Sequence, residues 1–132
     1  METDLSQYKG LMENLAQKMP QIVLAYLFGS TASGDRGPLS DYDFAVYLDE
    51  ADPKKRFDIK LQLMGEISAA LKSDKVDVVL INDTDNINLK YAIISEGKLL
   101  YEKEPYKTVV ESRIMNEYFD FRIFIDKYQK TK

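Results

Sequence analysis

Residues 22–46 read IVLAYLFGSTASGDRGPLSDYDFAV, and the rest of the chain can be interpreted outward from them. The first seven, Ile22–Phe28, are all apolar and favour β-structure, which predicts a strand buried on both faces. Two glycines, Gly34 and Gly37, and Pro38 lie among residues 30–40, which indicates a loop with at most one helical turn. A second strand is expected from Asp43 to Leu48. This segment therefore predicts two strands joined by a polar loop.

The flanking sequence predicts four helices and two more strands from its apolar periodicity. The helices are expected at residues 4–18, 53–72, 88–96 and 105–128, and the strands at residues 76–81 and 98–101. The order αβ(loop)βαβαβα predicts a single α/β (α+β) domain over residues 1–132, with a small sheet flanked by helices and a long C-terminal helix.

Two of these helices carry more apolar residues than one stripe needs. The 53–72 helix has a stripe of Phe57, Leu61, Met64, Ser68 and Leu71, which Ile59, Leu63 and Ile67 widen. The terminal helix has one face of Val110, Ile114, Tyr118, Phe121, Ile125 and Tyr128. Phe119 and Phe124 lie off that face, so a partner surface and ordinary core packing both remain open for this helix.

The composition excludes many kinds of site. The 132 residues include no histidine and no cysteine, so no Ser-His-Asp or Cys-His nucleophile, zinc site or thiol redox centre can be built. Any metal site must use oxygen ligands, which favours Mg²⁺, Mn²⁺ or Ca²⁺. The net charge of −4 argues against a nucleic-acid-binding face, and the longest apolar run of seven residues is too short to span a membrane. The acidic N-terminus lacks a signal-peptide pattern, so we expect a cytoplasmic protein.

The residues that indicate chemistry are Gly29-Ser30 and, ten residues later, Asp41-Tyr42-Asp43. Gly29 and Ser30 follow the end of a buried strand, where free backbone N–H groups suit a phosphate. Asp41 and Asp43 are two residues apart in an extended segment, so their side chains point to the same face. Two such carboxylates can share divalent cations that bind the phosphates of a nucleotide.

A third carboxylate, Asp77, interrupts the apolar strand at residues 76–81. A carboxylate buried in such a strand is costly unless it is paired or metal-bound. If this strand lies beside the one that carries Asp41 and Asp43, the three acids converge. The alternative is that Ser-Asp-Tyr-Asp forms only a turn and that Asp77 is only a polar strand residue.

The segments Leu27-Phe-Gly-Ser30 and Ser40-Asp-Tyr-Asp-Phe-Ala-Val46 resemble the signature of the minimal nucleotidyltransferases of the DNA polymerase β-like superfamily. The resemblance extends over nearly the whole chain, and it is strongest to the MNT antitoxins of HEPN/MNT toxin–antitoxin pairs. It implies the polymerase β-like fold, with a small mixed sheet. Residues 31 and 33 depart from it, because Thr31 and Ser33 replace basic residues that relatives often carry there.

The resemblance also implies an activity. Asp41, Asp43 and Asp77 would hold two Mg²⁺ ions, Gly29 and Ser30 would bind the phosphates of ATP, and Asp77 would help to deprotonate the attacking hydroxyl. The product would be an AMP group on a tyrosine of the HEPN RNase toxin, which is thereby neutralised. A hetero-oligomer with that toxin is a further expectation, with no direct contact to nucleic acid or membrane.

Two other functions remain open at this point. The chain could be an antitoxin that neutralises its toxin by binding alone, with a vestigial catalytic site. It could also be a transferase for a small hydroxyl compound such as an aminoglycoside, although relatives of that kind usually use a second domain to hold the acceptor. The short chain favours an acceptor that another molecule presents.

Overall fold

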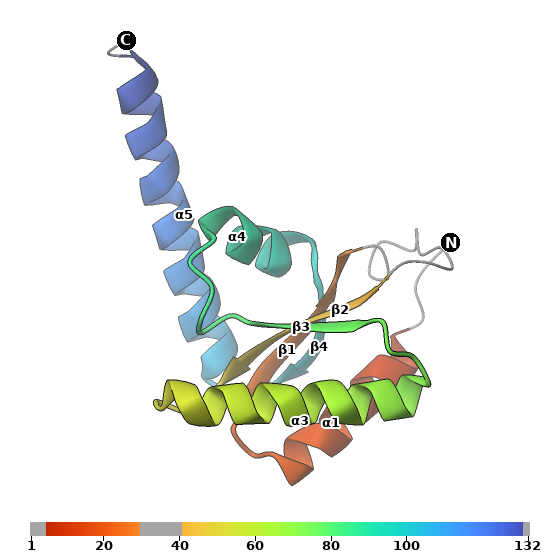
Figure 1. The fold of residues 1–132 in the computed structure, drawn as a ribbon. Coiled ribbons are helices and arrows are strands. Elements are labelled where there is room, and N and C mark those ends of the chain that lie inside the picture. Colours follow the sequence, from red (N-terminus) through yellow and green to blue (C-terminus); the bar gives the residue numbers. More distant parts are fainter. Residues whose placement is uncertain (1–4, 30–40, 131–132) are drawn as a thin grey trace.

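The computed structural model describes residues 5–29 and 41–130, which are arranged around one four-stranded sheet. The strand order is β3-β2-β1-β4, so β3 and β4 are the edges. In chain order the elements are α1 (Ser6–Lys18), β1 (Ile22–Phe28), β2 (Tyr42–Leu48), α3 (Pro53–Leu71), β3 (Val76–Leu80), α4 (Ile87–Glu96), β4 (Lys98–Glu102) and α5 (Tyr106–Lys130). Figure 1 shows the sheet between two layers of helices.

The sheet is mixed. β1 pairs antiparallel with both β2 and β4, whereas β2 and β3 run parallel. The two parallel strands are connected through α3, as a parallel pair requires a crossover. This is the small mixed sheet of the predicted polymerase β-like fold, and it confirms the fold class expected from the sequence.

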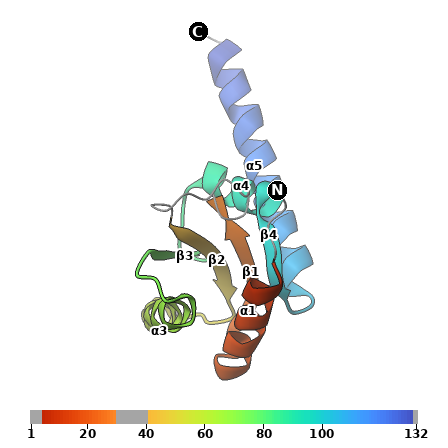
Figure 2. The same cartoon turned by 90° about the vertical axis from the view of Figure 1, so that its right-hand side faces the viewer.

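Alternate residues of the strands supply two separate cores. On one face, α1 and α3 cover a cluster that includes Leu27, Phe44 and Val78. On the other face, α4 and α5 cover a cluster that includes Tyr26, Ala45 and Ile93. Figure 2 shows the two helical layers on opposite sides of the sheet. Odd-numbered residues of β2 and β3 therefore point toward α4 and α5, and this alternation decides where Asp41, Asp43 and Asp77 lie.

The predicted elements are confirmed to within one or two residues at most boundaries. The strand over Ile22–Phe28 is buried along both faces, as its apolar run predicted. Asp52 begins α3, because its side chain accepts a hydrogen bond of 2.9 Å from the backbone N–H of Lys54. The loop expected at residues 30–40 lies outside the residues that the structure describes.

The predicted apolar stripe of the 53–72 helix is not buried in its first half, although Met64 and Leu71 farther along it pack against the core. Leu63 and Ile67 are fully buried, whereas Phe57 and Leu61 are 55% and 52% exposed. Spacing alone could not decide between the two stripes, because both repeat at helical intervals. The helix turns its Leu63 side to the sheet, and two large apolar side chains remain on its outer surface.

The long C-terminal helix α5 packs on the sheet only through its first half. Val110 and Ile114 are buried, and the hydroxyl of Tyr26 in β1 donates a short hydrogen bond to Glu111. Burial and this carboxylate raise the pKa of Tyr26. The second half projects beyond the body in Figures 1 and 2 and exposes Phe119, Phe124 and Tyr128. No helix among the described residues is long and apolar enough to cross a membrane.

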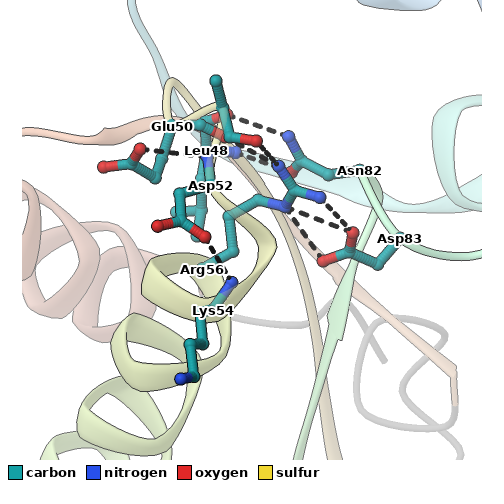
Figure 3. Close-up of polar contacts among 8 residues, drawn as sticks. Leu48, Glu50, Asp52, Lys54, Arg56, Asn82 and Asp83 are labelled. Atoms are coloured by element: carbon teal, nitrogen blue, oxygen red, sulfur yellow. Dashed lines mark hydrogen bonds and ion pairs between the residues drawn. The ribbon is translucent and has the colours of Figure 1, made fainter.

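A polar network closes the carboxyl ends of β2 and β3 (Figure 3). Asn82 exchanges two hydrogen bonds of 2.9 Å with the backbone N–H and carbonyl of Leu48. Arg56 of α3 pairs with Asp83, with 2.6 Å between Nη2 and Oδ1, and also donates to the carbonyl oxygens of Glu50 and Ala51. This end of the parallel pair is thus fixed by satisfied polar contacts.

Candidate active site

Asp43 and Asp77 are direct neighbours across the parallel strands β2 and β3, where they are Cα partners in the register. Their side chains share the face that α4 and α5 cover farther along the sheet. The expected adjacency of these two strands is therefore confirmed. Phe28 at the end of β1 also pairs with Asp43, so three strands meet at this point.

Asp41 lies one residue before β2 and is exposed. Its charge reaches the pair, because the pKa of Asp43 is raised by burial first, by the nearby Asp77 second and by Asp41 third. The structure thus brings the three predicted acids to one end of the sheet. Like charges at this separation disfavour one another unless a cation neutralises them.

Gly29 lies against this group of acids with a φ of +75°, a conformation that favours glycine. A Cβ atom at this position would be 2.4 Å from Oδ2 of Asp43, far inside van der Waals contact. The glycine therefore permits both the turn after β1 and the close approach of backbone to a carboxylate. Ser30, the other predicted phosphate-binding residue, lies outside the described residues.

The donor set fits a hard divalent cation. Asp43 and Asp77 on neighbouring strands and Asp41 just before β2 offer only oxygen ligands, as Mg²⁺ requires. Burial raises the pKa of Asp43 first, and the neighbouring carboxylates Asp77 and Asp41 raise it further. Over residues 5–29 and 41–130, no three Asp, Glu, His or Cys side chains are grouped closely enough to hold a metal ion.

Asp77 differs from the expectation of a buried strand residue, because its side chain is exposed. The reason is that β3 is an edge strand. Its exposed position opens onto a groove of about 530 Å³ that runs along β3 between α3 and α4. We call this the β3 groove; its lining includes Phe57, Lys60, Asp77, Val79, Thr84 and Leu89.

Sequence reasoning did not find the other residues of the β3 groove. Those nearest in the chain follow Asp77 in β3 and continue to Leu89 of α4, whereas Pro53, Phe57 and Lys60 come from α3, and none of them forms a recognisable motif with Asp77. The one available signal was the excess of apolar residues on the 53–72 helix, which contains more than one buried stripe needs.

Comparison with known proteins agrees with this geometry. Residues 11–106 match the family model described as "Polymerase beta, Nucleotidyltransferase". The chain is 30% identical over 110 residues to the protein adenylyltransferase MntA of Aphanizomenon flos-aquae, a match that covers 75% of this chain and 69% of that protein.

Solved structures share the fold. A toxin–antitoxin structure with AMP-PNP has a TM-score of 0.68 at 24% identity and covers 92% of this chain and 98% of the other. A tri-AMPylated HEPN toxin of Shewanella oneidensis in complex with its MNT antitoxin has a TM-score of 0.62 at 21% identity, with 96% and 99% covered. At these identities the structural likeness establishes the fold, and the family rests on the sequence matches. The chain therefore belongs to the polymerase β nucleotidyltransferase family, and it is a nucleotidyltransferase of the MNT type.

Proposed function

We propose that this protein is an antitoxin that transfers AMP from ATP to a tyrosine hydroxyl of a cognate HEPN toxin. The observation that carries the proposal is the pairing of Asp43 with Asp77 across neighbouring strands, with Asp41 near enough to affect Asp43 and the positive-φ Gly29 against Asp43. The names of the relatives support the choice of donor and acceptor, since one is a protein adenylyltransferase and another is associated with an AMPylated toxin. The AMP-PNP found with a relative of the same fold supports ATP as the donor.

The residues have distinct roles in this proposal. Asp41, Asp43 and Asp77 would hold Mg²⁺, which when bound supplies positive charge to the triphosphate. Backbone N–H groups at Gly29 and Ser30 would orient the phosphates. Asp77, on the exposed side of the group, would accept the proton of the acceptor hydroxyl.

The reaction balances as a single displacement. The acceptor oxygen forms a bond to the α-phosphorus while the bond between that phosphorus and the bridging oxygen to the β-phosphate breaks. Pyrophosphate leaves, and the hydroxyl proton passes to the carboxylate. Since the donor is ATP, we place the reaction in the cytoplasm.

The test is labelling of the HEPN toxin with ATP that carries its label at the α-phosphate. We expect label on the toxin with Mg²⁺ and none with a chelator or with label at the γ-phosphate. Asp41→Asn and Asp43→Asn should each lower the rate by at least ~10²-fold, because each removes charge at the reacting centre. Asp58→Asn, the same change at an exposed site on α3, is the matched control and should keep the rate.

Unchanged labelling by Asp43→Asn would refute the assigned site. Neutralisation of the toxin by the unlabelled, carboxylate-deficient variants would instead support an antitoxin that acts by binding alone. Labelling of an aminoglycoside in place of the toxin would support the small-molecule transferase.

A further inference from the structure

The β3 groove is continuous with the proposed active site. Asp77 belongs to both, because its strand separates the group of acids on its inner side from the groove along its outer edge. In Figure 1, β3 runs across the front of the molecule, with α3 below it and α4 above it. A molecule in the groove therefore lies next to the carboxylate that we propose as the proton acceptor.

The lining of this groove does not suit the phosphates of the donor. Asp77 and Asp83 both contribute to its wall, and Asp83 is already paired with Arg56. Lys60 is its one remaining cation in the part of the chain that the structure describes. A triphosphate would lie against a carboxylate with little compensating charge, whereas Gly29 offers phosphates a position on the opposite side of Asp77.

The outer wall of the groove suits an apolar or aromatic side chain. Phe57 lines it from α3 and is 55% exposed. Leu61 is not part of the lining, but it follows Phe57 by one helical turn on α3 and is 52% exposed. Within residues 5–29 and 41–130, every other large hydrophobic side chain with such exposure lies on α5. Exposed apolar side chains along a groove that also contains a reactive carboxylate are typical of a surface that binds a partner.

The geometry of in-line transfer determines whether ATP or the acceptor approaches from the outer edge of β3. The acceptor oxygen must approach the α-phosphorus opposite the departing pyrophosphate, so donor and acceptor occupy opposite sides of the reacting centre. With the phosphates on the side of Gly29 and Asp43, the outer edge of β3 is left for the acceptor.

Building on the proposed function, we propose that the β3 groove receives the polypeptide segment that carries the acceptor hydroxyl. Phe57 contacts the aromatic ring or its apolar neighbours within the groove, Leu61 extends this apolar contact along the exposed surface of α3, and the hydroxyl reaches Asp77. A volume of about 530 Å³ is sufficient for an aromatic side chain together with its adjoining backbone.

The first test separates acceptor binding from catalysis. The single variants Phe57→Ala and Leu61→Arg should each raise the KM for the toxin by ~10-fold, which is the loss of affinity expected when one peripheral apolar contact is removed. Each should leave the KM for ATP within about twofold. Both side chains are half-exposed, so the melting temperature should stay unchanged. Val109→Ala, an exposed apolar residue on α5, is the control and should leave both constants unchanged.

The second test locates the segment directly. A photo-crosslinking amino acid at position 61 should attach to the toxin peptide that contains the labelled tyrosine, and the same amino acid at position 109 should not. Crosslinks that map only to other toxin segments, together with unchanged KM values in both variants, would overturn the groove assignment while leaving the proposed function intact. Failure of the unaltered chain to label the toxin would overturn the proposed function, and the groove assignment with it.

Discussion

The parallel strands β2 and β3 have acidic side chains at both ends, and the two ends differ in whether these side chains form ion pairs. At the carboxyl end, Asp83 is paired with Arg56, whose remaining N–H groups donate to backbone carbonyls. At the amino end, Asp43 and Asp77 are adjacent, and neither forms an ion pair within the described residues. Burial raises the pKa of Asp43 first, and the nearby Asp77 and Asp41 raise it further.

This difference distinguishes a structural network from a reactive site. A charged side chain that is already ion-paired contributes to the fold and does not need a ligand to neutralise it. Like charges held together by rigid strands cost stability, and the cost is recovered when a cation binds.

Gly29→Ala should have the largest effect, and it acts on the amino end. The new methyl group would lie 2.4 Å from Oδ2 of Asp43, so the carboxylate must move, and the φ of +75° adds backbone strain. We expect the adenylylation rate to fall by ~10²-fold and stability to fall by about 1–2 kcal/mol. Initial rates and chemical denaturation measure the two effects.

The matched control is Gly65→Ala in α3, where an added Cβ meets nothing within 4 Å. In a helix interior this change should raise stability by roughly 0.5–1 kcal/mol and leave the rate unchanged. Equal rates for the two variants would show that the close approach of Gly29 to Asp43 is irrelevant to catalysis.

Asn82→Ala should have an intermediate effect, confined to the carboxyl end. It removes both hydrogen bonds to Leu48 and leaves the N–H of a buried residue without a partner, at a cost of about 1–3 kcal/mol. The rate of AMP transfer at the other end should not change once folding is complete. Denaturation midpoints measure the loss, and Asn88→Ala, at an exposed position in α4, should shift them by less than ~0.5 kcal/mol. A large fall in rate for Asn82→Ala would mean that the two ends are coupled.

The sequence was sufficient to predict the elements that carry Asp41 and Asp43 at the amino end of the strands. The spacing of Asp41 and Asp43 and the run from Ile22 to Phe28 are local patterns, and the structure places those elements as predicted. The β3 groove was not predictable, because its shape depends on the rotation of α3 about its own axis. Phe57 and Leu63 both belong to helical stripes, and only packing against the sheet shows which of them is buried. The exposure of Asp77 likewise depends on strand order, which the sequence does not encode locally.

For the aromatic second half of α5, the sequence left two interpretations, core packing and a partner surface. Phe119, Phe124 and Tyr128 are exposed in the isolated chain, which excludes them from its core. A partner surface at this helix stays a prediction.

Asp43→Asn should have the smallest effect on stability, and its sign tests the comparison most directly. The folded-state pKa of Asp43 is raised above 3.8, first by burial and then by Asp77 and Asp41, so ionisation of this group destabilises the fold. The penalty is absent below the unfolded-state pKa, grows as the pH rises toward the raised folded-state pKa and is complete above it. Removing the charge should therefore raise the melting temperature at pH 7 by up to about 3 °C, a modest gain because solvent screens a half-buried carboxylate.

This gain should disappear as the pH falls below about 3.8, where both forms are neutral. Mg²⁺ should raise the melting temperature of the unaltered chain more than that of the variant, since a cation stabilises the state that binds it. Thermal melts at pH 7 and pH 3.5, with and without Mg²⁺, measure all three quantities, and Asp58→Asn controls for a general charge effect. A variant that melts lower than the unaltered chain at pH 7 without Mg²⁺ would show that the amino end is as well neutralised as the Arg56 network, and the contrast between the two ends would no longer identify the active site.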